Sequence, residues 1–327
     1  MRLRAGLPVL WHGPTQVRIG TDPRWAVVLD DLSPSAARAL VSLPPGGDER
    51  SVLAALRREH VLDDEAAAVV AHLRSAHLLV DGRVGDSADA AVWGLLEADG
   101  DGASVLARRG AARVRVSGLG RLGAGLVMTL AGAGVGRIEL DDEATVTRHD
   151  IGWAGLTTRD VGSRRSHAVA RALHDAAPTV RTDRPGSGPV DLVVLVEHDV
   201  ADPTRHRVLV TDGVPHLSVV VREASVLVGP LVLPGRTPCL RCLDLHRAER
   251  DVGWPAVAAQ LAVRRPQPEE TILAAVAGPL AAAQAVAHLD GRPSAVQGAA
   301  IEVRLPDVSP RLLQWATHPQ CGCTGLP

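Results

Sequence analysis

A glycine-rich turn between an apolar strand and a helix is the feature that most restricts the fold of this chain. Residues 114–123 run Val-Arg-Val-Ser-Gly-Leu-Gly-Arg-Leu-Gly, and a helical stretch follows at 124–133. In such a turn Gly118 permits the tight bend, Gly120 lets a phosphate approach the backbone, and Gly123 lets helix and strand pack closely. The free N–H groups at the start of the helix favour a bound phosphate. The pattern predicts a Rossmann-like nucleotide site; the alternative is that these glycines serve backbone packing alone.

An acidic residue lies where the ribose of a nucleotide is expected. A second strand is predicted over 137–140, and Asp142 follows it, 22 residues after Gly120. A carboxylate at this position accepts hydrogen bonds from ribose hydroxyls in dinucleotide-binding folds. Asp142 therefore joins the three glycines as a candidate cofactor-binding residue.

The remainder of the chain after residue 111 alternates short apolar strands with helices. Such alternation indicates an α/β fold with a mostly parallel, Rossmann-like sheet and flanking helices. The predicted strands are 192–196, 208–211, 218–221 and 231–233, and the predicted helices include 166–176 and an alanine-rich buried helix at 271–289.

The N-terminal region has a different pattern. Short strands are predicted at 16–19 and 25–29, followed by three short helices and a strand at 78–80. This order resembles a small α+β winged-helix module. A length of 327 residues suits two domains. We therefore predict a winged-helix-like domain over 1–82, a linker helix over 83–110, and a nucleotide-binding domain over 111–327.

The four cysteines form two close pairs, Cys239-Leu-Arg-Cys242 and Cys321-Gly-Cys323. Two such pairs match a tetrahedral structural zinc site. The alternative is four reduced structural thiols. If all four bind zinc as thiolates, none remains free as a nucleophile for a thioester or persulfide step.

Composition restricts the partners. The net charge is −2, Lys, Phe and Tyr are absent, and six Trp are the only aromatic residues other than His. Neither nucleic acid nor an anionic membrane is expected as a partner, because no strong positive field is present and stacking platforms are scarce. The N-terminus is a poor signal peptide, and Pro279 and Gln284 interrupt the longest apolar stretch. A cytoplasmic protein is expected.

Several motifs together resemble the ThiF/MoeB/HesA superfamily, the bacterial relatives of ubiquitin-activating enzymes. The resemblance covers residues 111–324. The N-terminal part resembles peptide-binding winged-helix modules on ThiF-like proteins of peptide natural-product clusters. The motifs occur in this order: Gly118-Leu-Gly-Arg-Leu-Gly123, Ala133-Gly-Val-Gly136, the strand ending at Asp142, Asp160-Val-Gly162, Pro238-Cys-Leu-Arg-Cys242, Gly278-Pro-Leu280 and Cys321-Gly-Cys323.

The resemblance implies ATP and Mg²⁺ at the glycine turn and an acyl-adenylate formed on the C-terminal carboxylate of a peptide or small carrier protein. It also implies a homodimer. Within it, Arg165 takes the place of a family Lys, and the magnesium-binding Asp corresponds to His198 or Asp199. Arg165 and Asp199 are thus the candidate catalytic residues.

Other expected polar positions are substituted. Ala144 stands where the family has a second Asp, and Asp150 and Trp153 stand where it has Asn and Arg. Adenylyl transfer depends on charges placed around a developing negative centre, and Arg does not reproduce the geometry of Lys. These departures predict a weak enzyme or none.

Three functions remain open. The first is a ThiF-like protein with a degraded ATP site that binds a partner peptide and presents it to another enzyme. The second is an active ATP-dependent adenylyltransferase. The third is an NAD-dependent oxidoreductase that uses the same glycine turn with Asp142; the cysteine layout and the lack of an acid/base set disfavour it.

Overall fold

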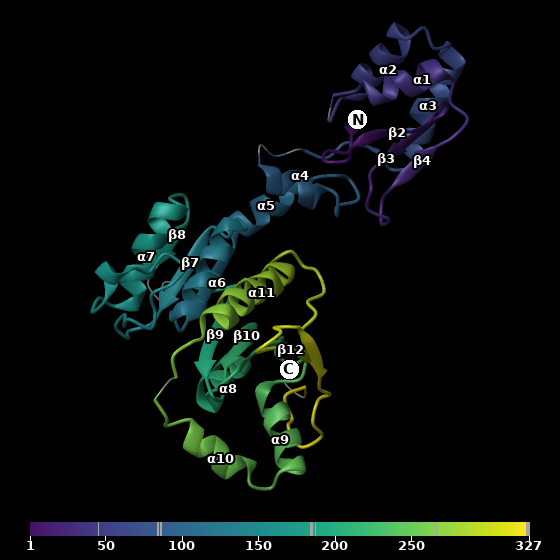
Figure 1. Cartoon of the computed structure of the whole chain (residues 1–327). Helices are drawn as coiled ribbons and strands as arrows, with labels where there is room; N and C mark the ends of the chain where they lie inside the picture. Colours follow the sequence, from purple (N-terminus) through teal and green to yellow (C-terminus); the bar gives the residue numbers. More distant parts are fainter. Residues whose placement is uncertain are drawn as a thin grey trace. The chain divides into compact units, whose positions relative to one another are not determined.

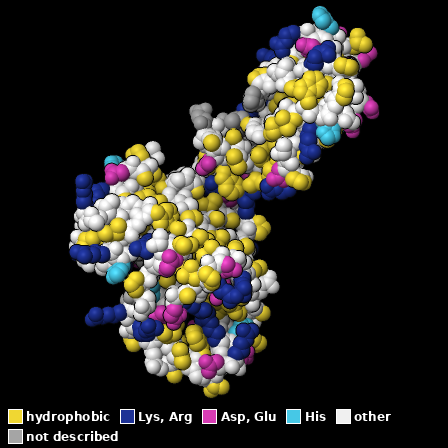
Figure 2. Space-filling model, in the orientation of Figure 1, with side chains coloured by type: hydrophobic (Ala, Val, Ile, Leu, Met, Phe, Trp, Pro, Cys, Tyr) yellow, Lys and Arg dark blue, Asp and Glu magenta, His cyan; other side chains and the backbone are white. Residues whose placement is uncertain are grey.

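The computed structural model describes the chain as two compact units, Met1–Ala107 and Arg108–Pro327 (Figure 1). Basic, acidic and hydrophobic side chains are interspersed on the surface shown in Figure 2, in keeping with the nearly neutral net charge. The description includes every residue except Pro45, Val84, Asp86, Arg184, Pro185, Ser187, Pro266 and residues 325–327.

The first unit is α+β, and its first three helices and small antiparallel sheets surround one apolar core. Ser33 and Asp48 are the N-caps of α1 and α2, because their side chains accept backbone N–H groups of the first turn. Its strands are β1 (Arg2–Leu3), paired with β5 (Leu79–Val80), and the three-stranded sheet of β2 (Val9–Gly13), β3 (Gln16–Ile19) and β4 (Val27–Leu29). Its helices are α1 (Pro34–Val41), α2 (Glu49–Arg58), α3 (Asp63–Ser75) and α4 (Ala88–Gly94); α5 (Gly102–Ala111) follows.

The second unit is built on an eight-stranded sheet, which confirms the predicted α/β class. Five neighbouring strands, β8, β7, β6, β9 and β10, run parallel. Strands β11, β12 and β13 then continue the sheet in antiparallel pairs. The spatial order is β13-β12-β11-β10-β9-β6-β7-β8. The strands are β6 (Arg113–Ser117), β7 (Arg137–Asp141), β8 (Arg181–Asp183), β9 (Leu192–His198), β10 (His216–Val221), β11 (Ser225–Val232), β12 (Ala299–Arg304) and β13 (Arg311–Gln314).

The strand order reverses between β6 and β9. From β6 the chain continues to β7 and β8 on one side, whereas β9 and β10 add to the other side. In open α/β sheets, ligands bind at the carboxyl ends of the strands beside such a reversal. The glycine turn follows β6 and therefore lies at this position.

Helix α11 (Thr271–Leu289) is the core helix of the second unit. It packs against α6 (Arg121–Gly132) and against β11, and the two helices lie side by side in Figure 1. By length and composition alone α11 would suffice to cross a membrane; in this unit it packs against α6 and β11, and 44% of its apolar window is buried. The remaining helices are α7 (Arg165–Ala176), α8 (Pro203–Thr211), α9 (Leu240–Arg250), α10 (Trp254–Leu261) and the 3₁₀ turn η1 (Thr158–Asp160).

One predicted strand is wrong. Residues 208–211 form the last turn of α8, not a strand. Asp202 starts this helix by accepting the N–H groups of Thr204 and Arg205, and Pro203 occupies its first turn. These start signals override the strand preference of the β-branched residues in 208–211.

A buried ion pair ties the start of the second unit to the end of α11. Arg109 Nε donates to Asp290 Oδ1 at 2.9 Å and Nη2 to Oδ2 at 2.6 Å, and neither side chain is exposed. We expect Asp290→Ala to lower the free energy of unfolding by about 3–5 kcal/mol, because it leaves a buried charge uncompensated. Denaturant titration followed by circular dichroism measures this. Glu143→Ala breaks the exposed pair with Arg164 and should change stability by less than about 1 kcal/mol.

A buried histidine makes stability depend on pH. His216 on β10 is fully buried, and burial lowers its pKa to about 4, helped by nearby His206. The unfolded chain takes up this proton near pH 6.5 and the folded unit only near pH 4. The free energy of unfolding should therefore fall by up to about 3 kcal/mol as the pH drops through this window. His216→Asn should flatten this dependence in denaturation curves, whereas replacing the exposed His174 should leave it unchanged.

Candidate functional site

The glycine turn has the geometry that a Rossmann-like fold requires. Gly118 has a φ of +89°, and a Cβ there would lie 2.3 Å from the Val196 carbonyl oxygen of β9. A Cβ on Gly123 would lie 1.9 Å from the Gly118 carbonyl oxygen. Both positions therefore exclude any side chain, and the start of α6 lies directly against the ends of β6 and β9.

Asp142 lies beside this turn. It follows β7, which pairs with β6, and its Oδ2 accepts the Leu119 N–H at 2.7 Å. Its Oδ1 accepts the Ala144 N–H at 2.8 Å. The structure thus brings together Asp142 and the predicted glycines, while their role toward a nucleotide remains a prediction.

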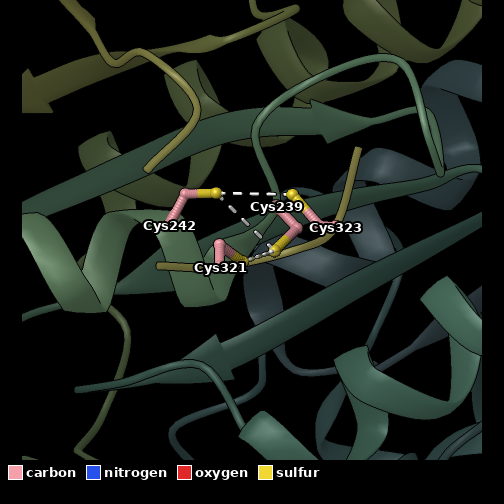
Figure 3. A group of neighbouring side chains, drawn as sticks. All are labelled: Cys239, Cys242, Cys321 and Cys323. Carbon is pink, nitrogen blue, oxygen red and sulfur yellow. Dashed lines mark hydrogen bonds between the residues drawn. The ribbon is translucent and has the colours of Figure 1, made fainter. Parts of the chain in front are cut away.

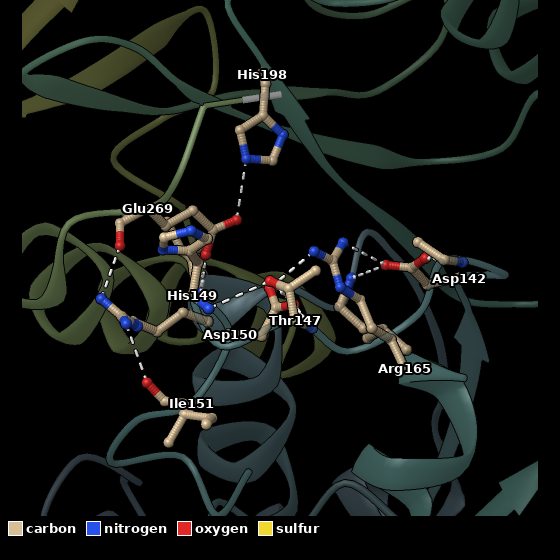
Figure 4. Close-up of polar contacts among 12 residues, drawn as sticks. Asp142, Thr147, His149, Asp150, Ile151, Arg165, His198 and Glu269 are labelled. Atoms are coloured by element: carbon tan, nitrogen blue, oxygen red, sulfur yellow. Dashed lines mark hydrogen bonds and ion pairs between the residues drawn. The ribbon is translucent and has the colours of Figure 1, made fainter. Parts of the chain in front are cut away.

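Arg165, the first residue of α7, is held by two carboxylates. Its Nη2 donates to Asp150 Oδ1 at 2.7 Å and its Nη1 to Asp142 Oδ2 at 3.4 Å (Figure 4). Burial lowers the pKa of Arg165, but the charges of Asp150 and Asp142 outweigh this and raise it above its ordinary value. Asp150 also accepts the N–H and Oγ1–H of Thr147 at 2.7 and 2.9 Å. The charge of Arg165 is therefore already neutralised within the fold.

Glu269, which the sequence analysis missed, occupies the start of α6. Its Oε2 accepts the Leu122 N–H at 2.5 Å, and its Oε1 lies 3.1 Å from His198 Nε2 (Figure 4). A Cβ on Gly120 would lie 2.6 Å from Glu269 Oε1. Arg121 Nη1 donates to the Glu269 backbone oxygen at 2.8 Å. A carboxylate of the chain itself thus lies where the helix N-terminus would bind a phosphate.

Asp199 lies apart from these contacts, directly after β9. It is 6% exposed, has a φ of +63°, and its N–H donates to the Val221 carbonyl oxygen at 2.7 Å. Its Oδ1 is 3.8 Å from Arg264 Nη1. In the described ranges of the chain no hydrogen bond or ion pair joins Asp199 to Arg165, so the two predicted catalytic residues do not contact each other.

The four cysteines come together as a compact group, with their sulfur atoms turned toward one another (Figure 3). The Sγ atoms of Cys239 and Cys321, and those of Cys242 and Cys323, are 3.4 Å apart, and all four lie within 4.8 Å of one another. Tetrahedral zinc with Zn–S bonds of about 2.3 Å separates its sulfurs by about 3.8 Å. The group therefore fits a zinc ion.

The thiol environment agrees with metal binding that releases protons. Burial raises the pKa of Cys239 above its usual range and raises that of Cys321 to about 11. Without a metal these groups are neutral thiols at pH 7. Zinc binds thiolates, so it must displace their protons, and its affinity falls as the pH falls.

A second group of possible metal ligands comprises His246, Glu249 and His318. It is better explained as a set of hydrogen bonds that holds the C-terminal segment to α9. His318 Nδ1 accepts the Gln320 N–H at 3.1 Å, so in the neutral ring Nε2 carries the proton and donates to Glu249 at 2.9 Å. A protonated ring nitrogen cannot bind a metal. The hydrogen bond from His318 lowers the pKa of Glu249 and holds the C-terminal segment on α9.

Comparison with known proteins identifies the family and the fold. The sequence matches the ThiF family over residues 96–323, and no curated protein sequence matches the chain. The structure of E. coli MccB with ATP has a TM-score of 0.71 at 16% identity, covering 99% of this chain and 100% of that one. The microcin C7 biosynthetic enzyme MccB in complex with N-formylated MccA gives 0.72 at 16%, with the same coverage. PaaA gives 0.71 at 17%, covering 94% and 98%. At such identities the likeness shows a shared fold, that of ThiF/MoeB-like adenylyltransferases.

We expect the purified protein to carry about one zinc ion per chain, and Cys242→Ser to lose most of it, because a buried ligand is removed from the tetrahedral set. Elemental analysis by mass spectrometry measures both. Glu249→Gln is the matched control and should leave the zinc content unchanged. If Glu249→Gln removes zinc and Cys242→Ser retains it, the metal lies at the histidine–glutamate group instead.

Proposed function

The chain belongs to the ThiF family, and we propose that it binds a peptide partner for modification while its own nucleotide site is held closed by Glu269. The observation that carries this proposal is the hydrogen bond from the Leu122 N–H to the Glu269 carboxylate at the start of α6. The family fold is that of an adenylyltransferase, so the proposal concerns a degraded form of a known type of site.

Glu269 opposes nucleotide binding in two ways. Its carboxylate accepts a backbone N–H that a phosphate would otherwise accept. It also places a negative charge where the negatively charged phosphate would bind. Two like charges about 4 Å apart repel by about 4 kcal/mol at an effective dielectric constant of about 20. His198, at hydrogen-bond distance from the carboxylate, further stabilises it there. ATP would therefore have to displace Glu269.

Arg165 supports the same conclusion. Adenylyl transfer needs positive groups that are available to the phosphates in the transition state. Arg165 instead donates its hydrogen bonds to Asp150 and Asp142. Asp142, in turn, is engaged with Leu119 and Ala144 rather than open to a ribose.

The first unit supports a peptide partner. Strand β2 lies at the edge of its three-stranded sheet and exposes Leu10 and Trp11, with 40% and 52% of their surface accessible. An extended peptide adds readily to such an edge, and apolar side chains beside it give specificity. MccB, which shares the fold, has been crystallised with N-formylated MccA. We propose that the partner is a peptide or small carrier protein that this chain presents to a modifying enzyme.

An active adenylyltransferase is the second candidate. It is favoured by the intact glycine geometry at Gly118 and Gly123 and by the fold shared with MccB bound to ATP. In this reading Glu269 withdraws when ATP and Mg²⁺ arrive, and the carboxylate of the partner is adenylated.

Calorimetric titration of the zinc-loaded protein with ATP and Mg²⁺ tests the closed site. We expect no binding by the natural chain at micromolar ATP, and at least about 10-fold tighter binding by Glu269→Ala, because the repelling carboxylate is gone. Glu270→Ala is the matched control: this neighbour caps α11 instead and should not change ATP affinity.

Micromolar binding by the natural chain, abolished by Asp142→Ala, would contradict the closed site and establish nucleotide binding at the glycine turn. ATP–pyrophosphate exchange that depends on a peptide carboxylate would then identify the active enzyme.

A further inference from the structure

A pocket of about 410 Å³ lies within the second unit, beyond the carboxyl ends of β9 and β10. Asp199, which follows β9, and Arg222, which follows β10, both line it. Arg247 and Trp254 line it from α9 and α10. The volume is in the range of pockets that hold small ligands or short peptide segments. The carboxyl ends of β6, β9 and β10 share one edge of the sheet, so the glycine turn lies at the same edge.

Two half-buried arginines line this pocket without a full set of anionic partners. Burial lowers the pKa of Arg222, and the charge of Arg247 lowers it further. Arg247 has one acidic partner, Asp244 Oδ1 at 3.4 Å, and its guanidinium lies 4.9 Å from the centre of the Trp254 ring. Over the ranges that the structure describes, the Arg222 side chain makes no hydrogen bond or ion pair.

The acidic residues nearby do not neutralise this pair. Asp199 is directed to Arg264, and Asp251 Oδ1 accepts the Gly253 N–H at 2.9 Å. Glu223 is exposed. The charges of Glu302 and Glu223 raise the pKa of Arg222, but burial and the charge of Arg247 lower it more. Among the described residues Arg222 thus has no acceptor and Arg247 has a single one, so a ligand would supply the acceptors that the remaining guanidinium donors lack.

We propose that Arg222 and Arg247 bind a carboxylate of the peptide partner, with Trp254 packing against the adjoining part of that peptide. The inference rests on the proposed peptide-binding function and names the chemistry of the partner: an acidic segment. A guanidinium matches a carboxylate in a bidentate, charge-assisted geometry, and a partly desolvated site strengthens that bond.

The apolar lining of the pocket supports a peptide as the source of this carboxylate. Trp254 and Leu261 line the pocket beside the two arginines. Trp254 donates its indole Nε1–H to Asp244 at 3.1 Å and has Arg247 over one ring face, so the other ring face is what it offers to a ligand. A free inorganic anion would use the two arginines but gain nothing from these apolar side chains.

Calorimetry with the tetrapeptide acetyl-Gly-Gly-Glu-Gly amide tests this. We expect the zinc-loaded full chain to bind it at millimolar concentration, the Gln analogue at least about 10-fold more weakly, and Arg222→Gln and Arg247→Gln to lose about 10-fold in affinity for the Glu peptide. Arg250→Gln is the matched control: it lines the same pocket but is exposed, so its effect should stay within about two-fold. Circular dichroism and zinc content show whether each variant has folded.

Equal affinity for the Glu and Gln peptides, or no binding of either, would overturn the proposal. Tighter binding of inorganic phosphate than of the Glu peptide, lost in Arg222→Gln, would identify a phosphate site instead. The test is separate from that of the closed nucleotide site, because neither arginine contacts Glu269. Loss of Glu-peptide binding in the arginine variants would support the pocket even if Glu269→Ala left ATP affinity unchanged.

Discussion

The approach of α6 to the ends of β6 and β9 is the constraint on which the rest of the site depends. It is possible only because Gly118 and Gly123 lack a Cβ; any side chain there would overlap a carbonyl oxygen. The approach aims the free N–H groups of the turn and of the first helical residues into one small space. Those groups must be paired when they are buried. Asp142 pairs with Leu119 and Glu269 pairs with Leu122, so the backbone geometry decides where the carboxylates of the site lie.

The charges of the second unit are arranged in two contrasting ways. Around the glycine turn Arg165 lies between two aspartates, and Glu269 lies between a helix N-terminus and His198. Beyond β9 and β10, Arg222 has no hydrogen bond or ion pair among the described residues, and Arg247 has one acidic partner, Asp244. A polar group that is desolvated without a partner is destabilising, and a fold that keeps one usually gains from a ligand. The two arrangements are the basis of both proposals, a nucleotide site closed by its own residues and an arginine pocket open to a carboxylate.

The sequence predicted what local patterns determine. The turn, the mostly parallel α/β class, helix α11 over 271–289 and the two cysteine pairs each follow from residues close together in the chain. It could not predict contacts made over long separations. Glu269 reaches Leu122 across 147 positions, and nothing in the residues around Glu269 indicates that its carboxylate meets another helix. Asp150 was noted only as a departure from the family, although it holds Arg165. The predicted strand at 208–211 failed because capping at Asp202 outweighs local strand preference.

The cysteine group helps to position α9, the helix that carries Arg247. Cys239 is the N-cap of α9 and Cys242 lies in its first turn, while Cys321 and Cys323 come from the C-terminal segment. A zinc ion there would fix the start of the helix that carries Arg247. The hydrogen bond from His318 to Glu249 holds the other end of the same helix to the same segment. Because both ends of α9 would be held in this way, the fold and not the ligand sets the position of Arg247 relative to Arg222, which follows β10. A pocket organised in advance loses little binding free energy to the ordering of side chains, so the proposed acidic segment can be short.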